Sequence, residues 1–160
     1  MSVEWVLMAK YAAIFDLDRT LIAASSAPVC QRYVAEAGIS DGSLNPVVEP
    51  VVGAVSRVMK LVYDTVGESR LMMQPAKLAV RASAGWPVDE VRAAAAAAAD
   101  ELVDEVQPFA ELLIEEHREA GRLLVLASTS PIAFTQPLAD ALGFDAVIGT
   151  KWADDGAHYL

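Results

Sequence analysis

The stretch that most constrains the fold of this chain is residues 12–21, AAIFDLDRTL, where an apolar run leads directly into two carboxylates and a threonine. A short, unbroken apolar run is typical of a strand that is buried on both faces of a parallel sheet. Asp16 and Asp18 follow the run, where the carboxyl end of the strand would lie, and open α/β sheets place their active sites at this end. Residues two apart in an extended segment share a face. Repulsion between neighbouring carboxylates is relieved by a bound cation or by a raised pKa.

A second apolar run, residues 123–128 (LLVLAS), ends in the hydroxyl of Ser128. The Asp-x-Asp-x-Thr pattern of Asp16, Asp18 and Thr20 resembles motif I of the haloacid dehalogenase superfamily, and the run ending at Ser128 resembles its motif II. The long segment between the motifs is similar to that of subfamily IB, which carries a helical cap there and includes the phosphoserine phosphatases. The resemblance covers nearly the whole chain.

The resemblance and the element order predict an α/β fold with an incomplete Rossmann-like, doubly wound parallel sheet and an all-helical cap between its first two strands. We expect residues 1–22 and 108–160 to form the hydrolase core and residues 23–107 to form the cap. Helical patterns cover 25–37, 47–66, 68–83, 89–106, 108–120 and 131–142, and strand patterns cover 122–128 and 145–149. Residues 150–160, with Asp154 and Asp155 before Gly156, are typical of a hairpin.

The charge balance excludes some classes of partner. With 12 Lys and Arg against 22 Asp and Glu, the net charge of −10 argues against nucleic acid, whose phosphates require clustered basic residues. A small phosphorylated metabolite fits, because a bound divalent cation supplies local positive charge. The single cysteine, Cys30, fits a reducing cytoplasm and is expected to be buried. The start lacks the pattern of a signal peptide, and no segment is expected to span a membrane.

The resemblance also assigns roles to individual residues. It implies that Asp16 is the nucleophile and forms an aspartyl-phosphate, and that Asp18 protonates the leaving oxygen and then activates water. It implies a Mg²⁺ cofactor held by Asp16 and by the backbone carbonyl of Asp18. It places the phosphoryl group against the Ser128 hydroxyl, the Thr129 amide and Thr20. The alternative interpretation is structural: the two aspartates cap a turn, and Ser128 caps the helix that opens at Pro131.

Two substitutions depart from the family pattern. Arg19 stands where many relatives have glycine, and we interpret it as neutral because its side chain can point away. Ser25 stands where phosphoserine phosphatases typically have a glutamate that reads the substrate's ammonium group, which counts against phosphoserine. The cap contributes Leu71, Met72 and Met73 beside a valine stripe. Most of these are ordinary packing residues, and the alternative is a pocket for an apolar or amphiphilic phosphate ester.

The segment expected to carry motif III and motif IV is absent from residues 1–160. Lys151 follows the last strand too soon to be the motif III lysine, and Asp154 and Asp155 are interpreted as an exposed hairpin tip rather than the motif IV acidic pair. We therefore expect an N-terminal part of a longer phosphatase, weak or inactive by itself. Residues 12–15 would then form an open sheet edge, from which we expect self-association into a homodimer.

Three functions are compatible with these patterns. The first is a Mg²⁺-dependent phosphomonoester hydrolase acting on a small or amphiphilic phosphate ester. The second is a non-catalytic domain that binds a phosphorylated ligand or a partner. The third is the N-terminal part of a bifunctional lipid enzyme. The fold alone does not choose among them.

Overall fold

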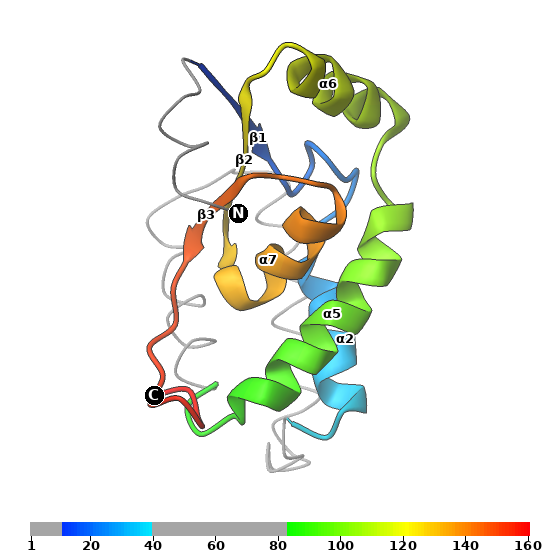
Figure 1. Cartoon of the computed structure of the whole chain (residues 1–160). Coiled ribbons are helices and arrows are strands. Elements are labelled where there is room, and N and C mark those ends of the chain that lie inside the picture. The colour runs from blue at the N-terminus through cyan, green and yellow to red at the C-terminus, as the bar shows by residue number, and fades with distance from the viewer. Residues whose placement is uncertain (1–10, 40–82) are drawn as a thin grey trace, which may run out of the picture.

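A computed structural model describes residues 11–39 and 83–160 (Figure 1). The predicted helix 47–66 and nearly all of the predicted helix 68–83, including the Leu71–Met73 segment, lie outside these residues. The remaining predicted elements are all present, with small shifts at their ends.

The core is a parallel sheet of three strands in the order β1-β2-β3: β1 (Ala12–Asp16), β2 (Leu123–Pro131) and β3 (Ala146–Thr150). Strand β1 pairs with β2 in regular register from Ala12 opposite Leu123 to Asp16 opposite Ala127. This arrangement confirms the α/β fold class. It brings the carboxyl ends of all three strands to one edge of the sheet, because parallel strands share a direction.

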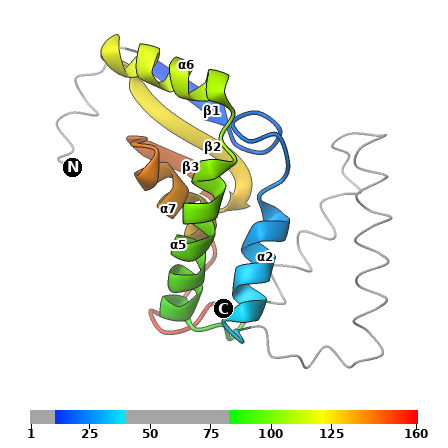
Figure 2. The same cartoon turned by 90° about the vertical axis from the view of Figure 1, so that its right-hand side faces the viewer.

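Helices α6 (Pro108–Glu119) and α7 (Ile132–Ala141) connect the strands and cover one face of the sheet (Figures 1 and 2). The ring of Phe15 on this face packs edge-to-face against His117 of α6 at 5.7 Å and against Phe144, just after α7, at 5.5 Å. Side chains alternate along a strand, so Ile14 and Ile148 point to the opposite face, where they are 66% and 59% exposed. The expected burial of β1 on both faces is therefore wrong for Ile14, since the connecting helices of the described chain cover only the other face.

The two described helices of the predicted cap segment, α2 (Ala27–Glu36) and α5 (Val88–Asp104), pack side by side (Figure 2). Helix α2 ends at Gly38, whose φ of 69° suits glycine in the left-handed conformation that stops a helix. The alanine-rich helix α5 also packs against α7 of the core. Small side chains permit this close approach on two sides, and these alanines are buried: Ala94, Ala95, Ala98 and Ala99.

Residues 153–160 form the predicted hairpin turn, with a hydrogen bond from the Asp155 amide to the His158 carbonyl at 3.1 Å. Its return strand pairs with the segment before α5, since the Tyr159 amide donates to the Trp86 carbonyl at 3.0 Å. Trp152 packs edge-to-face against Trp86, Phe134 and Tyr159. The hairpin is thus anchored to the start of α5 as well as to β3. None of the helices in the described part of the chain is long and apolar enough to cross a membrane.

Candidate active site

Asp16 is the last residue of β1, and the loop that follows holds its carboxylate in place. The hydroxyl of Thr20 donates to Oδ2 of Asp16 at 2.8 Å, and the Leu21 amide donates to the Asp16 carbonyl at 3.2 Å. Leu17 and Leu21 are 1% exposed and anchor this loop in the core. The carboxylate itself stays exposed to solvent, where a substrate could reach it.

Asp18 is half-buried and links three parts of the fold. Its Oδ1 accepts the backbone amide of Ser26, just before α2, at 2.5 Å. Its Oδ2 accepts the hydroxyl of Ser130 in β2 at 3.4 Å. The structural alternative therefore holds in part for Asp18, because this carboxylate does cap the start of α2. Ser26 and Ser130 were not among the predicted site residues, and neither carries a family signature that would have revealed it.

Residues 128–130 bulge out of the sheet between β2 and β3. From Ala127 to Pro131 strand β2 advances four residues while its partner advances only from Ile148 to Thr150. Such a bulge changes the direction in which side chains at the end of a strand point. Gly149 makes room for it, since a Cβ there would lie 3.0 Å from the Ser130 carbonyl oxygen.

The hydroxyl of Ser128 accepts the Ser130 amide at 3.1 Å inside this bulge. Helix α7 has Pro131 at its N-cap and no side-chain cap hydrogen bond. The prediction that Ser128 caps this helix is therefore wrong, because the strand continues three residues further than expected. Thr129 is exposed, and its carbonyl accepts the Thr150 hydroxyl at 2.7 Å.

The loop after β1 and the bulge in β2 meet at one edge of the sheet. Asp16 lies opposite Ala127, the residue before Ser128, and Asp18 reaches Ser130. All five predicted site residues, Asp16, Asp18, Thr20, Ser128 and Thr129, come from these two segments. The roles assigned to them remain predictions.

Arg19 has a φ of 64°, the left-handed conformation that glycine adopts more easily. Ser25 is exposed, and its hydroxyl accepts the Ala27 amide at 3.4 Å, so it takes part in the turn that begins α2.

Cys30 lies one turn further along α2. Burial and, to a smaller extent, the charge of Asp18 raise the pKa of Cys30 to about 11. The cysteine is buried as predicted.

The donors at this edge have the chemistry that Mg²⁺ prefers, since they are carboxylate and carbonyl oxygens. Oδ2 of Asp16 is taken by Thr20, and both oxygens of Asp18 accept hydrogen bonds. A carboxylate oxygen has further lone pairs, so these hydrogen bonds do not prevent Asp16 from also binding a cation. Among residues 11–39 and 83–160 there is no group of three His, Cys, Asp or Glu side chains that could hold a metal. Asp154 and Asp155 instead accept backbone amides within the C-terminal turn.

Comparisons with known proteins identify the family and the fold. The sequence profile described as haloacid dehalogenase-like hydrolase matches residues 13–160. A curated relative, the "inhibition of morphological differentiation protein" of Streptomyces azureus, is 31% identical over 161 residues. That match covers 97% of this chain and 54% of the relative, so the chain spans about half of the relative's length.

Two solved structures are similar in fold. A protein of unknown function from Bordetella pertussis Tohama I superposes with a TM-score of 0.67 at 22% identity, covering 94% of this chain and 65% of that protein. A phosphoserine phosphatase, solved as an analogue of its phospho-aspartyl intermediate, superposes with a TM-score of 0.54 at 19% identity, covering 94% and 61%. At these identities the likeness establishes the fold and leaves the substrate open.

Proposed function

Because this chain belongs to the haloacid dehalogenase-like hydrolase family, we propose that the whole protein is a Mg²⁺-dependent phosphomonoester hydrolase that works through an aspartyl-phosphate. The observation that supports this most is the meeting of two segments at the carboxyl edge of the sheet. Asp16 lies opposite Ala127, and the neighbouring Ser128 begins the bulge. This neighbourhood of the two segments supports the proposal that Asp16 acts as nucleophile beside the Ser128 hydroxyl.

In the proposed reaction, a carboxylate oxygen of Asp16 attacks phosphorus, and the bond from phosphorus to the ester oxygen breaks. Asp18, protonated at this stage, gives its proton to the departing alcohol. In the second step Asp18 takes a proton from water, the water oxygen attacks phosphorus, and inorganic phosphate leaves Asp16. The hydrogen bond from Thr20 fixes one oxygen of Asp16 and leaves the other to attack.

The bulge supplies donors for the phosphoryl group in this scheme. The Ser128 hydroxyl and the Thr129 amide would bond phosphoryl oxygens as negative charge develops. Mg²⁺, held by Asp16 and the backbone carbonyl of Asp18, would neutralise the repulsion between a carboxylate and a phosphate dianion when it is bound. Ser130 and the Ser26 amide would keep the Asp18 carboxylate aimed at the leaving oxygen.

We propose a small or amphiphilic phosphate ester as substrate, acted on in the cytoplasm. Ser25 offers no carboxylate for the ammonium group of phosphoserine. The apolar residues of the predicted cap would accommodate an amphiphilic ester, and they are also the feature that suggests a bifunctional lipid enzyme. These residues lie outside the described part of the chain. The cytoplasmic assignment rests on the single, buried cysteine.

The test uses the full-length protein with an aryl phosphate and Mg²⁺. Asp16→Asn should lower kcat by roughly a thousandfold or more, and Asp18→Asn by about a hundredfold or more, because each removes a group that acts on the reacting atoms. Asp154→Asn is the matched control, since Asp154 is exposed in the C-terminal turn and should keep full activity. Full turnover by Asp16→Asn would refute the assignment of the nucleophile.

A non-catalytic phosphate-binding domain is the second candidate. It is favoured by the lack, in the described part of the chain, of a third ligand beside Asp16 and Asp18. This function predicts saturable binding of inorganic phosphate without turnover of any ester by the full-length protein. Turnover that depends on Asp16 would exclude it.

We also propose that the chain forms a homodimer through the free edge of β1. This strand pairs only with β2 among the described strands. Its sequence from Ala12 to Phe15 contains no charge or proline that would discourage pairing with another chain.

A further inference from the structure

A pocket of about 380 Å³ lies at the amino ends of β1 and β2, away from the edge that carries Asp16. Its lining combines the start of β1, the last turn of α6 and the residue before β2: Tyr11, Ala12, Ala13, His117 and Arg122. From Ala12 to Asp16 the strand rises roughly 13 Å, so the pocket is separate from the candidate active site. Its volume falls within the range of small-ligand sites.

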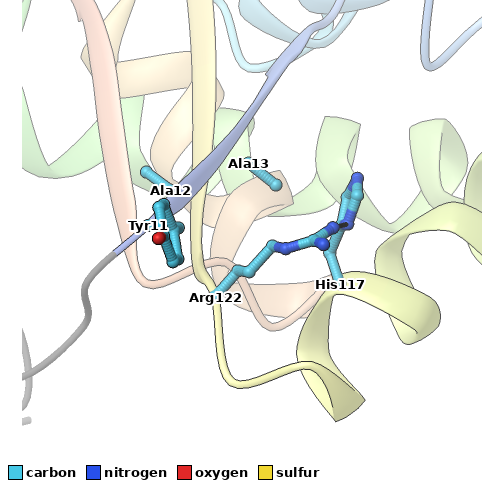
Figure 3. Close-up of a pocket in the computed structure, with 5 residues that line it drawn as sticks. All are labelled: Tyr11, Ala12, Ala13, His117 and Arg122. Carbon is cyan, nitrogen blue, oxygen red and sulfur yellow. Dashed lines mark hydrogen bonds between the residues drawn. The ribbon is translucent and has the colours of Figure 1, made fainter.

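The guanidinium of Arg122 is the chemically distinctive group of this pocket. Figure 3 shows its side chain extended toward α6, where Nη1 contacts Nδ1 of His117. A guanidinium only donates hydrogen bonds, so Nδ1 is the acceptor in this contact. The half-buried guanidinium therefore contacts an imidazole rather than a carboxylate.

Other arginines of the described chain are arranged differently. Arg32, Arg92 and Arg118 each form an ion pair with a nearby carboxylate. No carboxylate of residues 11–39 and 83–160 pairs with Arg122, although the chain carries 22 acidic residues. Asp145, the residue before β3, accepts the Leu124 amide at 2.8 Å.

Removing a cation from water without a counter-ion is unfavourable, and a guanidinium has five N–H donors arranged to hold planar or tetrahedral oxyanions. We propose that this pocket is a binding site for a small oxyanion, a phosphate or a carboxylate, with Arg122 as its main ligand. His117 is a positioning residue that holds the guanidinium against α6. The site is independent of the phosphatase reaction, because none of its residues reaches Asp16 or Ser128.

The test is a titration of the ¹⁵N-labelled protein in Mg²⁺-free buffer, once with inorganic phosphate and once with succinate, followed by amide and arginine Nε shifts. Saturable shifts at Arg122, His117 and Ala12 are expected, and the tighter of the two probes identifies the phosphate or the carboxylate as the preferred group. Arg122→Gln should weaken this binding by about tenfold or more, because it removes the positive charge. Arg122→Lys should weaken it less, because lysine keeps the charge and loses only the paired N–H donors of the guanidinium.

Ser128→Ala is the matched control. It removes a hydroxyl at the other end of the sheet and should leave the shifts at Arg122 unchanged. An unchanged melting temperature of Arg122→Gln would show that the loss of binding is local. The proposal is overturned if neither probe gives saturable shifts at Arg122, if Arg122→Gln binds as well as the wild type, or if the shifts gather around Ser128 and vanish in Ser128→Ala.

Discussion

Arg19 illustrates how a single residue can carry strain at a site. It lies between Asp18 and Thr20 with a φ of 64°, a conformation that costs a residue with a Cβ about 1–2 kcal/mol. The sequence suggested that arginine in place of glycine is neutral. The backbone conformation gives the substitution a cost instead, since glycine would adopt this φ without strain.

We expect Arg19→Gly to raise the free energy of unfolding by about 1 kcal/mol, part of the relief being offset by the greater freedom of glycine in the unfolded chain. Urea denaturation measures the change. Arg19→Ala is the control, because it removes the guanidinium with its contacts and keeps the strained backbone, so it should not share the gain in stability of Arg19→Gly. A destabilised Arg19→Gly would show that the arginine side chain contributes more than the strain costs.

Cys30 gives a second residue-scale prediction. Its pKa is raised from 9.0 to about 11, mainly by burial, so the folded state holds the thiol proton more tightly than the unfolded state does. The stabilising effect of the neutral thiol is complete below pH 9 and is lost as the pH rises toward 11, by at most about 3 kcal/mol. Cys30→Ala should lack this part of the alkaline decline.

The measurement compares denaturation curves of the wild type and Cys30→Ala between pH 7 and pH 11, a range set by the two pKa values. Burial also raises the pKa of Tyr159, but that tyrosine is present in both proteins and cancels in the difference. Parallel pH profiles for the two proteins would contradict the buried, neutral thiol.

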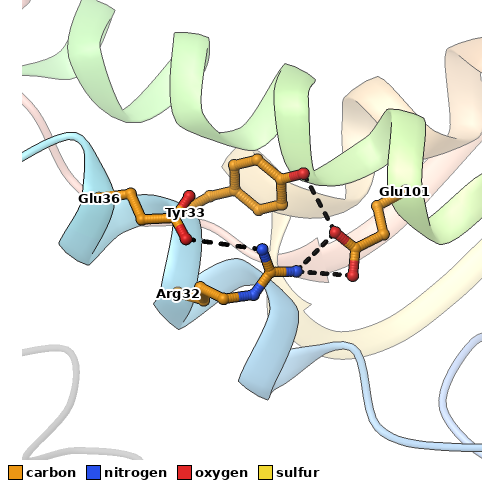
Figure 4. Close-up of polar contacts among 4 residues, drawn as sticks. All are labelled: Arg32, Tyr33, Glu36 and Glu101. Atoms are coloured by element: carbon orange, nitrogen blue, oxygen red, sulfur yellow. Dashed lines mark hydrogen bonds and ion pairs between the residues drawn. The ribbon is translucent and has the colours of Figure 1, made fainter.

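At the scale of elements, helices α2 and α5 are joined by a polar cluster (Figure 4). Nη2 of Arg32 donates to both carboxylate oxygens of Glu101, at 2.6 and 2.5 Å, and the Tyr33 hydroxyl donates to the same carboxylate at 3.1 Å. Glu36 pairs with Arg32 at 3.6 Å from within α2. The cluster fixes the register of one helix against the other more than it adds stability, because exposed ion pairs contribute little.

The hydrogen bond from Arg32 lowers the pKa of Glu101 below 4.5. We therefore expect Arg32→Gln to raise the pKa of Glu101 toward its usual value, as measured by carboxyl ¹³C shifts. A lowered folded pKa means that the stabilising effect is present above about pH 4.5 and is lost as the pH falls through the folded pKa. Arg92→Gln, which breaks the separate pair with Asp89, should leave Glu101 unchanged. An unaltered Glu101 pKa in Arg32→Gln would contradict the cluster.

The element boundaries also show what the sequence could and could not predict. The apolar run 12–15 predicted β1 to within a residue or two, and Pro108 and Gly121 did the same for the start and end of α6. Hydrophobic patterns and helix-ending residues act locally, so the sequence is enough to locate such elements. The bulge at Ser128–Ser130 was missed, since it depends on the space left by Gly149 in the neighbouring strand. Ser26 and Ser130 were missed because they contact Asp18 across the fold, and such contacts leave no periodic pattern in the sequence.

At the scale of the whole molecule, apolar surface remains open on the side of β1. Tyr11 is 65% exposed and Ile14 is 66% exposed, beside the edge of β1 with which no other described strand pairs. On the outer side of α6, Phe109, Leu112 and Leu113 are also exposed. A strand edge without charge or proline is the more specific of these surfaces, because its backbone groups can pair with another chain.

Ile14→Lys should weaken self-association of the chain by roughly tenfold or more, because a charged side chain on an edge strand opposes pairing with another chain. Sedimentation velocity over a range of concentrations measures the dimer fraction. Leu112→Lys is the matched control, because Leu112 is an apolar residue on α6 that is at least as exposed as Ile14, and its substitution should leave the dimer intact. A wild-type chain that stays monomeric at high concentration would refute the edge as an interface, and an equal effect of the control would move the interface to α6.

The central claim is that the carboxylate of Asp16 attacks phosphorus. The most direct measurement is mass spectrometry of peptides from the full-length protein, quenched in acid during turnover of a phosphate ester with Mg²⁺. We predict a phosphoryl group on the peptide that contains Asp16, lost after substrate is exhausted and absent from Asp16→Asn. A phosphoryl group on a different residue, or steady turnover with none on Asp16, would contradict the account.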